Sequence, residues 1–220
     1  MPLVAIVVFE PLDRAAIGRS GGTAQAVTGQ LVLFSMLSIS IVGGSVMTER
    51  LWRTWDRLRA TPAAPMELMV GKALPVGTVL ACQQGAVLSF GIVVAGLHVK
   101  SAGALVLAVA FWVATLMALG TALSLVARSS AEFSAVQDIG SFVATSLGGA
   151  LVPLADMPAW ARAIAPVSPG YWAMSALRGG LDGQVATVVR SGGALLGFAA
   201  AAVCVAAWRL GRGAGRSARL

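Results

Sequence analysis

The sequence predicts an all-α protein, a polytopic bundle of about five membrane-spanning helices. Only 11% of the 220 residues are charged and 57% are hydrophobic, whereas a soluble domain carries roughly a quarter of its residues as Asp, Glu, Lys and Arg. The charged residues also lie in the gaps between long apolar runs, as they do when lipid covers the helices. Membrane topology therefore explains the net charge of +7, and no nucleic-acid partner is expected.

Five apolar runs approach or exceed the length of about 20 residues that a helix needs to cross a bilayer. They cover about residues 26–47, 73–99, 103–127, 133–154 and 191–208. Residues 1–25 contain an apolar stretch that is too short to span, and we expect them to be the remnant of an outer loop. Residues 209–220 form a basic tail. Cys82 and Cys204 fall inside apolar runs and are expected to be small buried hydrophobes.

The distribution of Lys and Arg predicts the orientation, because these residues collect beside the cytoplasmic ends of spans. One side of the expected bundle carries ten of them: Arg50, Arg53, Arg57, Arg59, Lys72, Arg128, Arg209, Arg212, Arg216 and Arg219. The other side carries six: Arg14, Arg19, Lys100, Arg162, Arg178 and Arg190. We therefore expect the first side, with the C-terminal tail, to face the cytoplasm.

The stretch "TERLWRTWDRLRATPAAPMELMVGK", residues 48–72, joins the first two expected spans on that side. Thr48 can cap a helix, and Pro62 ends it. At helical spacing, the apolar and aromatic side chains share one face and the arginines the opposite face; the two sets are Leu51, Trp55 and Leu58, and Arg50, Arg53 and Arg57. The pattern predicts an amphipathic helix on the membrane surface. It is either a passive anchor or a docking site for a soluble partner.

The stretch "GGALVPLADMPAWARAIAPVSPGYWAMSALRG", residues 148–179, follows the fourth expected span on the other side. Four prolines, at positions 153, 158, 166 and 169, prevent one continuous helix. The stretch is nevertheless apolar and carries Trp160, Tyr171 and Trp172. We expect broken helices that dip into the outer leaflet, where protein must cover irregular backbone. The alternative is a plain amphipathic outer loop.

Polar side chains inside spans are the default candidates for a transport pathway. Gln83 and Gln84 lie within the second expected span and Asp138 near the start of the fourth. Hydrogen bonds between helices would also explain the glutamines, and solvation at the interface would explain Asp138. A membrane enzyme needs converging nucleophiles, carboxylates or metal ligands, and a lone His98 at a span boundary supplies none of these sets. No enzymatic activity, bound metal or cofactor is therefore expected.

Glycines mark places where helices can approach one another closely. Gly193 and Gly197 form a GxxxG pattern in the last expected span, and the pairs at 43–44 and 148–149 offer further sites. Such patterns are also frequent by chance in helices rich in Ala and Gly.

The charged stretch at 48–72 and the proline-rich stretch at 148–179 both resemble segments of the type-2 ABC exporter permeases. In that family a span ends in Glu-Arg, a charged helix ending close to "LRATP" follows, and the next span opens with Glu-Leu and Gly-Lys. The matching residues are Glu49, Arg50, the run "DRLRATP" at 56–62, Glu67, Leu68, Gly71 and Lys72. The family's outer loop has a "MPxW" segment and a broken half-helix, matched by Met157, Pro158, Trp160, Pro166, Pro169, Tyr171, Leu177 and Arg178. The resemblance covers roughly residues 26–208 and is nearest to bacterial drug and antibiotic exporters such as the daunorubicin-resistance permeases.

This resemblance implies the membrane half of an exporter that moves a drug-like, antibiotic or lipid-type substrate out across the bacterial plasma membrane. ATP and Mg would be bound by a separate ATPase subunit, docked on a coupling helix at 48–61 through Glu49, Arg50, Arg53, Trp55, Asp56, Arg57 and Arg59. An outer element would gate the exit through Met157, Pro158, Trp160, Pro166, Pro169, Tyr171 and Arg178. A second copy or a sibling permease would complete the path, with membrane lipid around both.

The sequence departs from the family at its N-terminus. Relatives have six spans with both ends inside, beginning with a cytoplasmic amphipathic helix and a first span that are not found here. We therefore expect the chain to be N-terminally short, because its true start lies upstream or its gene is truncated; the alternative is a genuine five-span form. The alternative function is a truncated, non-transporting membrane protein or a regulatory relic of such a permease.

Overall fold

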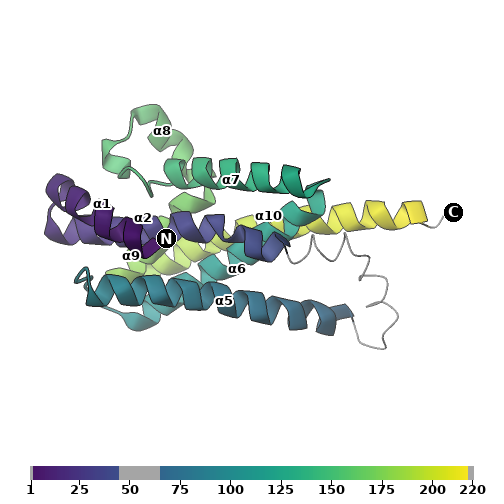
Figure 1. Cartoon of the computed structure of the whole chain (residues 1–220), viewed down its shortest axis with the longest axis horizontal. Coiled ribbons are helices and arrows are strands. Elements are labelled where there is room, and N and C mark those ends of the chain that lie inside the picture. Colours follow the sequence, from purple (N-terminus) through teal and green to yellow (C-terminus); the bar gives the residue numbers. More distant parts are fainter. Residues whose placement is uncertain (1, 45–64, 218–220) are drawn as a thin grey trace.

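The computed structural model describes residues 2–44 and 65–217, and every regular element in them is helical (Figure 1). The elements are α1 (Pro2–Ile17), α2 (Arg19–Leu37), α5 (Pro65–Val93), α6 (Ala102–Val126), α7 (Ser130–Leu147), η1 (Leu154–Asp156), α8 (Ala159–Ile164), η2 (Ala165–Val167), α9 (Pro169–Leu181) and α10 (Val185–Ser217). The long helices lie side by side along one axis, and the short ones gather at one end. The prediction of an all-α membrane bundle is confirmed.

Four helical segments in the described part are long and apolar enough to cross a membrane, one fewer than expected. They are Gly21–Gly44, Leu74–Val93, Ala102–Val126 and Val185–Arg209. The missing one is the expected span 133–154. Its helix, α7, is 18 residues long and ends at Leu147, where Gly149 turns the chain with a φ of 84°. The Ser, Thr, Gln and Asp residues of α7 make it too polar to qualify by composition.

Helix α2 lies at the centre of the bundle. About 67% of its apolar window is buried, compared with 28–33% for the other three candidate spans. It contacts α1, α5, α7 and α9, and Val27, Leu31, Val32 and Met36 are completely or almost completely buried on it. The other helices expose large apolar side chains on their outer faces, as helices that contact lipid do.

Side-chain hydrogen bonds join α2 to its neighbours. The regular helix is interrupted at Ser38, and the chain is helical again from residue 39. Two α7 side chains donate to carbonyls just before this break: Gln137 Nε2 to Leu37 O at 2.8 Å, and Ser141 Oγ to Met36 O at 3.1 Å. These bonds supply polar partners where the helix is irregular, as an apolar environment requires.

Glycines allow close backbone approaches at the end of α7. A Cβ at Gly148 would lie 2.5 Å from Gly170 C and 2.6 Å from Tyr171 N, at the start of α9. The expectation of close packing at 148–149 is therefore confirmed at Gly148. Gly193 and Gly197 have no atom within 4 Å of a built Cβ, so the GxxxG pattern makes no close contact with the described part of this chain.

One expectation about particular residues is corrected, and the N-terminal segment is now described. Cys82 and Cys204 are exposed, because each lies on the outward face of its helix, so the expectation that they are buried is wrong. Residues 2–17, expected to belong to an outer-loop remnant, form the helix α1. This helix packs along α2, with Ile6 almost fully buried.

The glycine contacts predict opposite effects for the same substitution at two sites. Gly148→Ala should lower the thermal unfolding temperature in detergent, because overpacking against the α9 backbone costs about 1–3 kcal/mol. Gly197→Ala should leave it unchanged or raise it, because alanine favours a helix by about 1 kcal/mol over glycine and its Cβ meets open space. A melting temperature that falls equally in both variants would refute the close approach of α7 and α9.

Candidate functional site

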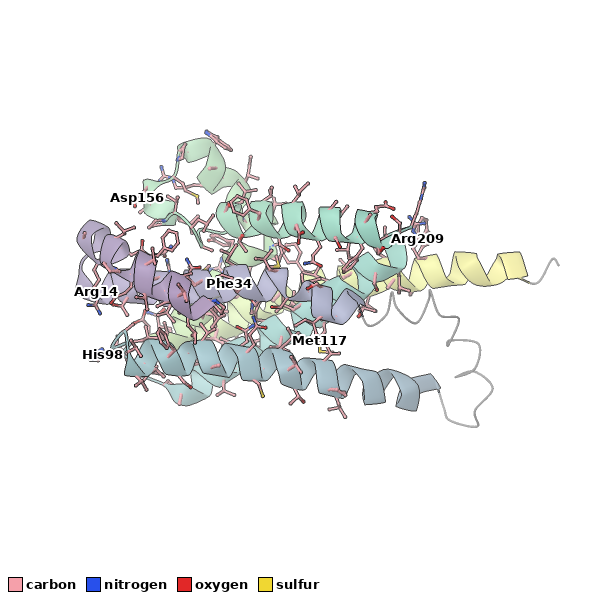
Figure 2. The ribbon with its side chains drawn as sticks, in the orientation of Figure 1. Arg14, Phe34, His98, Met117, Asp156 and Arg209 are labelled. Atoms are coloured by element: carbon pink, nitrogen blue, oxygen red, sulfur yellow. The ribbon has the colours of Figure 1, made fainter. Side chains whose placement is uncertain are left out.

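The bundle has two chemically different ends. The α1–α2, α5–α6, α7–α9 and α9–α10 connections gather at one end, here called the cavity end. The α6–α7 connection and the end of α10 lie at the other, here called the C-terminal end (Figure 1). Figure 2 shows Arg14 and His98 at the cavity end and Arg209 at the C-terminal end. In the described chain, the helix order separates the basic residues into the two groups predicted from the charge pattern.

The predicted docking helix lies outside the described residues, and so do all of its site residues: Glu49, Arg50, Arg53, Trp55, Asp56, Arg57 and Arg59. The elements on either side of it are described. The helical segment that contains α2 reaches Gly44, and α5 begins at Pro65, both toward the C-terminal end (Figure 1). Residues 45–64 therefore join two neighbouring helices at the end of the bundle that carries Arg209.

The proline-rich segment at the cavity end is broken into short helices, as predicted. Pro153 and Pro158 immediately precede η1 and α8, Pro166 lies in η2, and Pro169 is the first residue of α9. Proline fits these positions because the first turn of a helix has no partner for its N–H groups. The breaks let the chain turn between α7 and α9.

The start of α9 is held firmly, while α8 projects outward. Ser168 caps α9 by accepting a hydrogen bond from Gly170 N at 3.1 Å, and it donates to Ala144 O of α7. Trp172 Nε1 donates to Pro166 O at 2.9 Å, and the Trp172 ring packs edge-on against Tyr171 with centroids 5.1 Å apart. Trp160 on α8 is 65% exposed. Among the other predicted gating residues, Met157 is half-buried and Pro158 and Pro166 are exposed.

A cavity of about 790 Å³ opens at the cavity end, within the range of about 300–1,000 Å³ that is usual for ligand sites. Four segments surround it: the α1–α2 region, the α5–α6 connection, residues 153–155 and the end of α9. The polar side chains that line it include Arg14, Gln25, His98, Lys100, Arg178 and Asp182. Arg178 and Asp182 also line a smaller cavity of about 230 Å³ beside it.

Only Arg178 of these cavity residues was predicted as a site residue. Arg14, Lys100 and Asp182 lie in connections far apart in the sequence, and each alone reads as a solvated residue at the end of a span. In the sequence, the one indication that they belong together was that all three lie on the same expected side of the membrane. Their convergence on one cavity depends on how α1, α6 and α9 pack together, which spacing along the chain does not reveal.

The three predicted pathway residues do not form one site. Gln84 is almost fully buried on α5, on the same face as Leu80, and its Nε2 has no hydrogen-bond partner in the described chain. Gln83 is half-buried and Asp138 is exposed on α7. Asp138 Oδ1 accepts a hydrogen bond of 3.4 Å from the neighbouring Gln137. Gln84 is thus the one member of the set whose side chain is buried with an unused donor.

The comparisons with known proteins agree with this architecture. The family model described as ABC-2 type transporter matches residues 2–181, which include α1, α2, α5 to α9 and the cavity end. Neither the curated proteins nor the solved structures gave a match. Because the family model covers most of the chain, the protein belongs to the ABC-2 type transporter family.

Proposed function

We propose that this chain is the permease subunit of an ATP-driven exporter in a bacterial plasma membrane, with its C-terminal end in the cytoplasm. The observation that carries the proposal is the family match over residues 2–181. ABC-2 domains are the membrane-spanning, non-catalytic subunits of ABC transporters and normally work with an ABC ATPase. The proposed cargo is drug-like, antibiotic or lipid-type, as in the exporters that the sequence resembles.

Residues 48–61 are the proposed docking site for the ATPase, which binds the ATP and Mg. The position of the neighbouring helices supports this assignment. The segment that contains α2 ends at Gly44 and α5 begins at Pro65, so a force applied between them acts on both helices. Since α2 is the most buried span, a rigid-body shift of α2 would move several neighbours together.

The proline-broken segment is the proposed exit gate, with Met157, Pro158, Trp160, Pro166, Pro169, Tyr171 and Arg178 as its main residues. The packing of this segment supports the proposal, because α8 has few buried contacts while the helices on either side of it, α7 and α9, are bonded to each other. Helix α8 buries only Ala161 among its residues, whereas α9 is bonded to α7 through Ser168. Short helices with few buried contacts open at low free-energy cost.

A second permease copy, or a sibling, is the proposed partner within the membrane. The outward face of α10 supports this, because Gly193 and Gly197 leave open space there, next to the exposed side chains of Leu196 and Val203. Small residues on an apolar face allow another helix to approach closely in lipid.

Charge reversal in the docking segment tests the proposed function. The double variant Arg53→Glu/Arg57→Glu should lose co-purification with the ATPase, because it replaces two cations on one face of the helix predicted from the sequence by anions. The matched variant Arg162→Glu/Arg190→Glu changes the same charge at the cavity end and should retain the ATPase. If the first variant retains the ATPase as well as the unmodified chain does, residues 48–61 are not the docking site.

Gln84 gives a separate test of the pathway. Gln84→Leu should leave thermal stability unchanged or raise it, because it removes a buried amide whose Nε2 has no partner. The same variant should reduce ATP-dependent uptake of daunorubicin into inverted vesicles that contain the chain and its ATPase. Gln137→Leu is the control, and it should lower stability because it breaks the bond to Leu37 O. Undiminished uptake by Gln84→Leu would remove Gln84 from the pathway.

A further inference from the structure

The cavity at the cavity end carries an excess of positive charge. Its lining includes Arg14, Lys100 and Arg178 and one carboxylate, Asp182. Two of the three cations already have acidic partners. Arg14 forms an ion pair with Glu10 and donates to Ala95 O at 2.9 Å, and Lys100 Nζ lies 3.3 Å from Asp182 Oδ1.

Arg178 has no such partner. In the described chain no carboxylate lies within ion-pair distance of its guanidinium, and no hydrogen bond from that group is found. The side chain is nevertheless half-buried in the wall between the two cavities. Burial lowers the pKa of the Arg178 guanidinium below its usual range. A cation that is partly withdrawn from water and has no counterion is disfavoured, so an anion in the cavity would stabilise it.

A second group in the same lining also lacks a partner. Gln25 is only 2% exposed, and its Nε2 donates to Gly149 O at 2.9 Å. That bond fixes the orientation of the amide, so Oε1 is left as a buried acceptor without a donor in the described chain. This oxygen is inaccessible from the cavity, so the group that the cavity offers to a ligand is the guanidinium of Arg178.

The position of the cavity indicates where such a ligand comes from. Its lining residues 21–25 lie at the start of one candidate span, and residues 95–100 lie between the ends of two others. These levels correspond to the headgroup region of a bilayer. The lining also includes Leu97, Leu154 and Leu181, which suit the apolar part of a lipid next to its headgroup. Clustered basic side chains at the membrane surface attract anionic lipid headgroups.

We infer that this cavity binds the phosphate of a glycerophosphoryl group, whose oxygens accept hydrogen bonds from the Arg178 guanidinium. The guanidinium is suited to phosphate because its fork of N–H groups matches two phosphate oxygens. Both an anionic phospholipid and a soluble glycerol phosphate carry this group, and the level of the cavity favours the lipid. The inference is independent of whether the ATPase docks at residues 48–61.

The test titrates the full purified chain, in a neutral detergent, with dioctanoyl phosphatidylglycerol and measures bound lipid by native mass spectrometry. The Arg178→Gln variant should raise Kd at least about tenfold, because it removes a charge-assisted hydrogen bond. The matched control is Arg190→Gln, which neutralises an exposed arginine at the same end, outside the cavity lining, and it should leave Kd unchanged. Equal Kd values for Arg178→Gln and the unmodified chain, or an equal loss in both variants, would overturn the inference.

Two further arms change the ligand. Phosphatidylcholine of the same chain length carries the same phosphate, but its choline cation makes it zwitterionic, so it should bind this basic cavity more weakly than phosphatidylglycerol. Equal binding of the two lipids would overturn the inference. Competition by soluble glycerol 3-phosphate shows whether the natural ligand is a lipid or a soluble phosphate. Failure to compete supports a lipid, and competition that Arg178→Gln abolishes supports a free phosphate at the same site.

Discussion

The structure depends on one constraint, that polar groups buried in a membrane protein must find partners within the protein. Helix α2 carries more buried polar side chains than the other candidate spans, namely Thr23, Gln25, Thr28, Gln30 and Ser35, and it also has a break at Ser38. Its surroundings provide partners for much of this polarity. Trp112 Nε1 of α6 donates to Ser35 Oγ at 2.7 Å, and α7 side chains bond the carbonyls of Met36 and Leu37. A helix whose buried polar side chains and free carbonyls require hydrogen-bond partners has to be surrounded by other helices.

This central position connects the two ends of the bundle. At the cavity end, Thr23 and Gln25 of α2 line the cavity. At the C-terminal end, the same helical segment reaches Gly44, beside the proposed docking residues. Hydrogen bonds between membrane helices contribute about 0.6 kcal/mol each on average, so the packing of its buried side chains also holds α2 in place. A coupling between the proposed docking site and the cavity would act through this one helix.

The sequence predicted those features that follow directly from a residue type, such as spans from apolar residues and helix breaks from proline. Long apolar runs predicted the four candidate spans, and the prolines predicted the breaks before η1, α8 and α9. The expectation that the cysteines are buried was wrong, because burial depends on three-dimensional surroundings, and the expected span 133–154 is not among the four candidate spans. Apolar residues continue from 133 to 154 in the sequence, yet the turn at Gly149 divides them, and Cys82 and Cys204 lie on helix faces that periodicity alone did not assign. The cavity was beyond prediction for the same reason, since its cations lie on separate elements.

Disulfide trapping between α2 and α5 is the most direct test of the central position of α2. A Cβ built at Gly91 lies 3.4 Å from Val27 Cβ, close to the mean Cβ–Cβ separation of a disulfide, about 3.8 Å. In a chain with Cys82→Ser and Cys204→Ser, the pair Val27→Cys/Gly91→Cys should form an intramolecular disulfide on mild oxidation. Val27→Cys with the native, exposed Cys204 should form none. Failure of the first pair, with labelling of position 27 by a thiol reagent dissolved in the lipid, would contradict the buried position of α2.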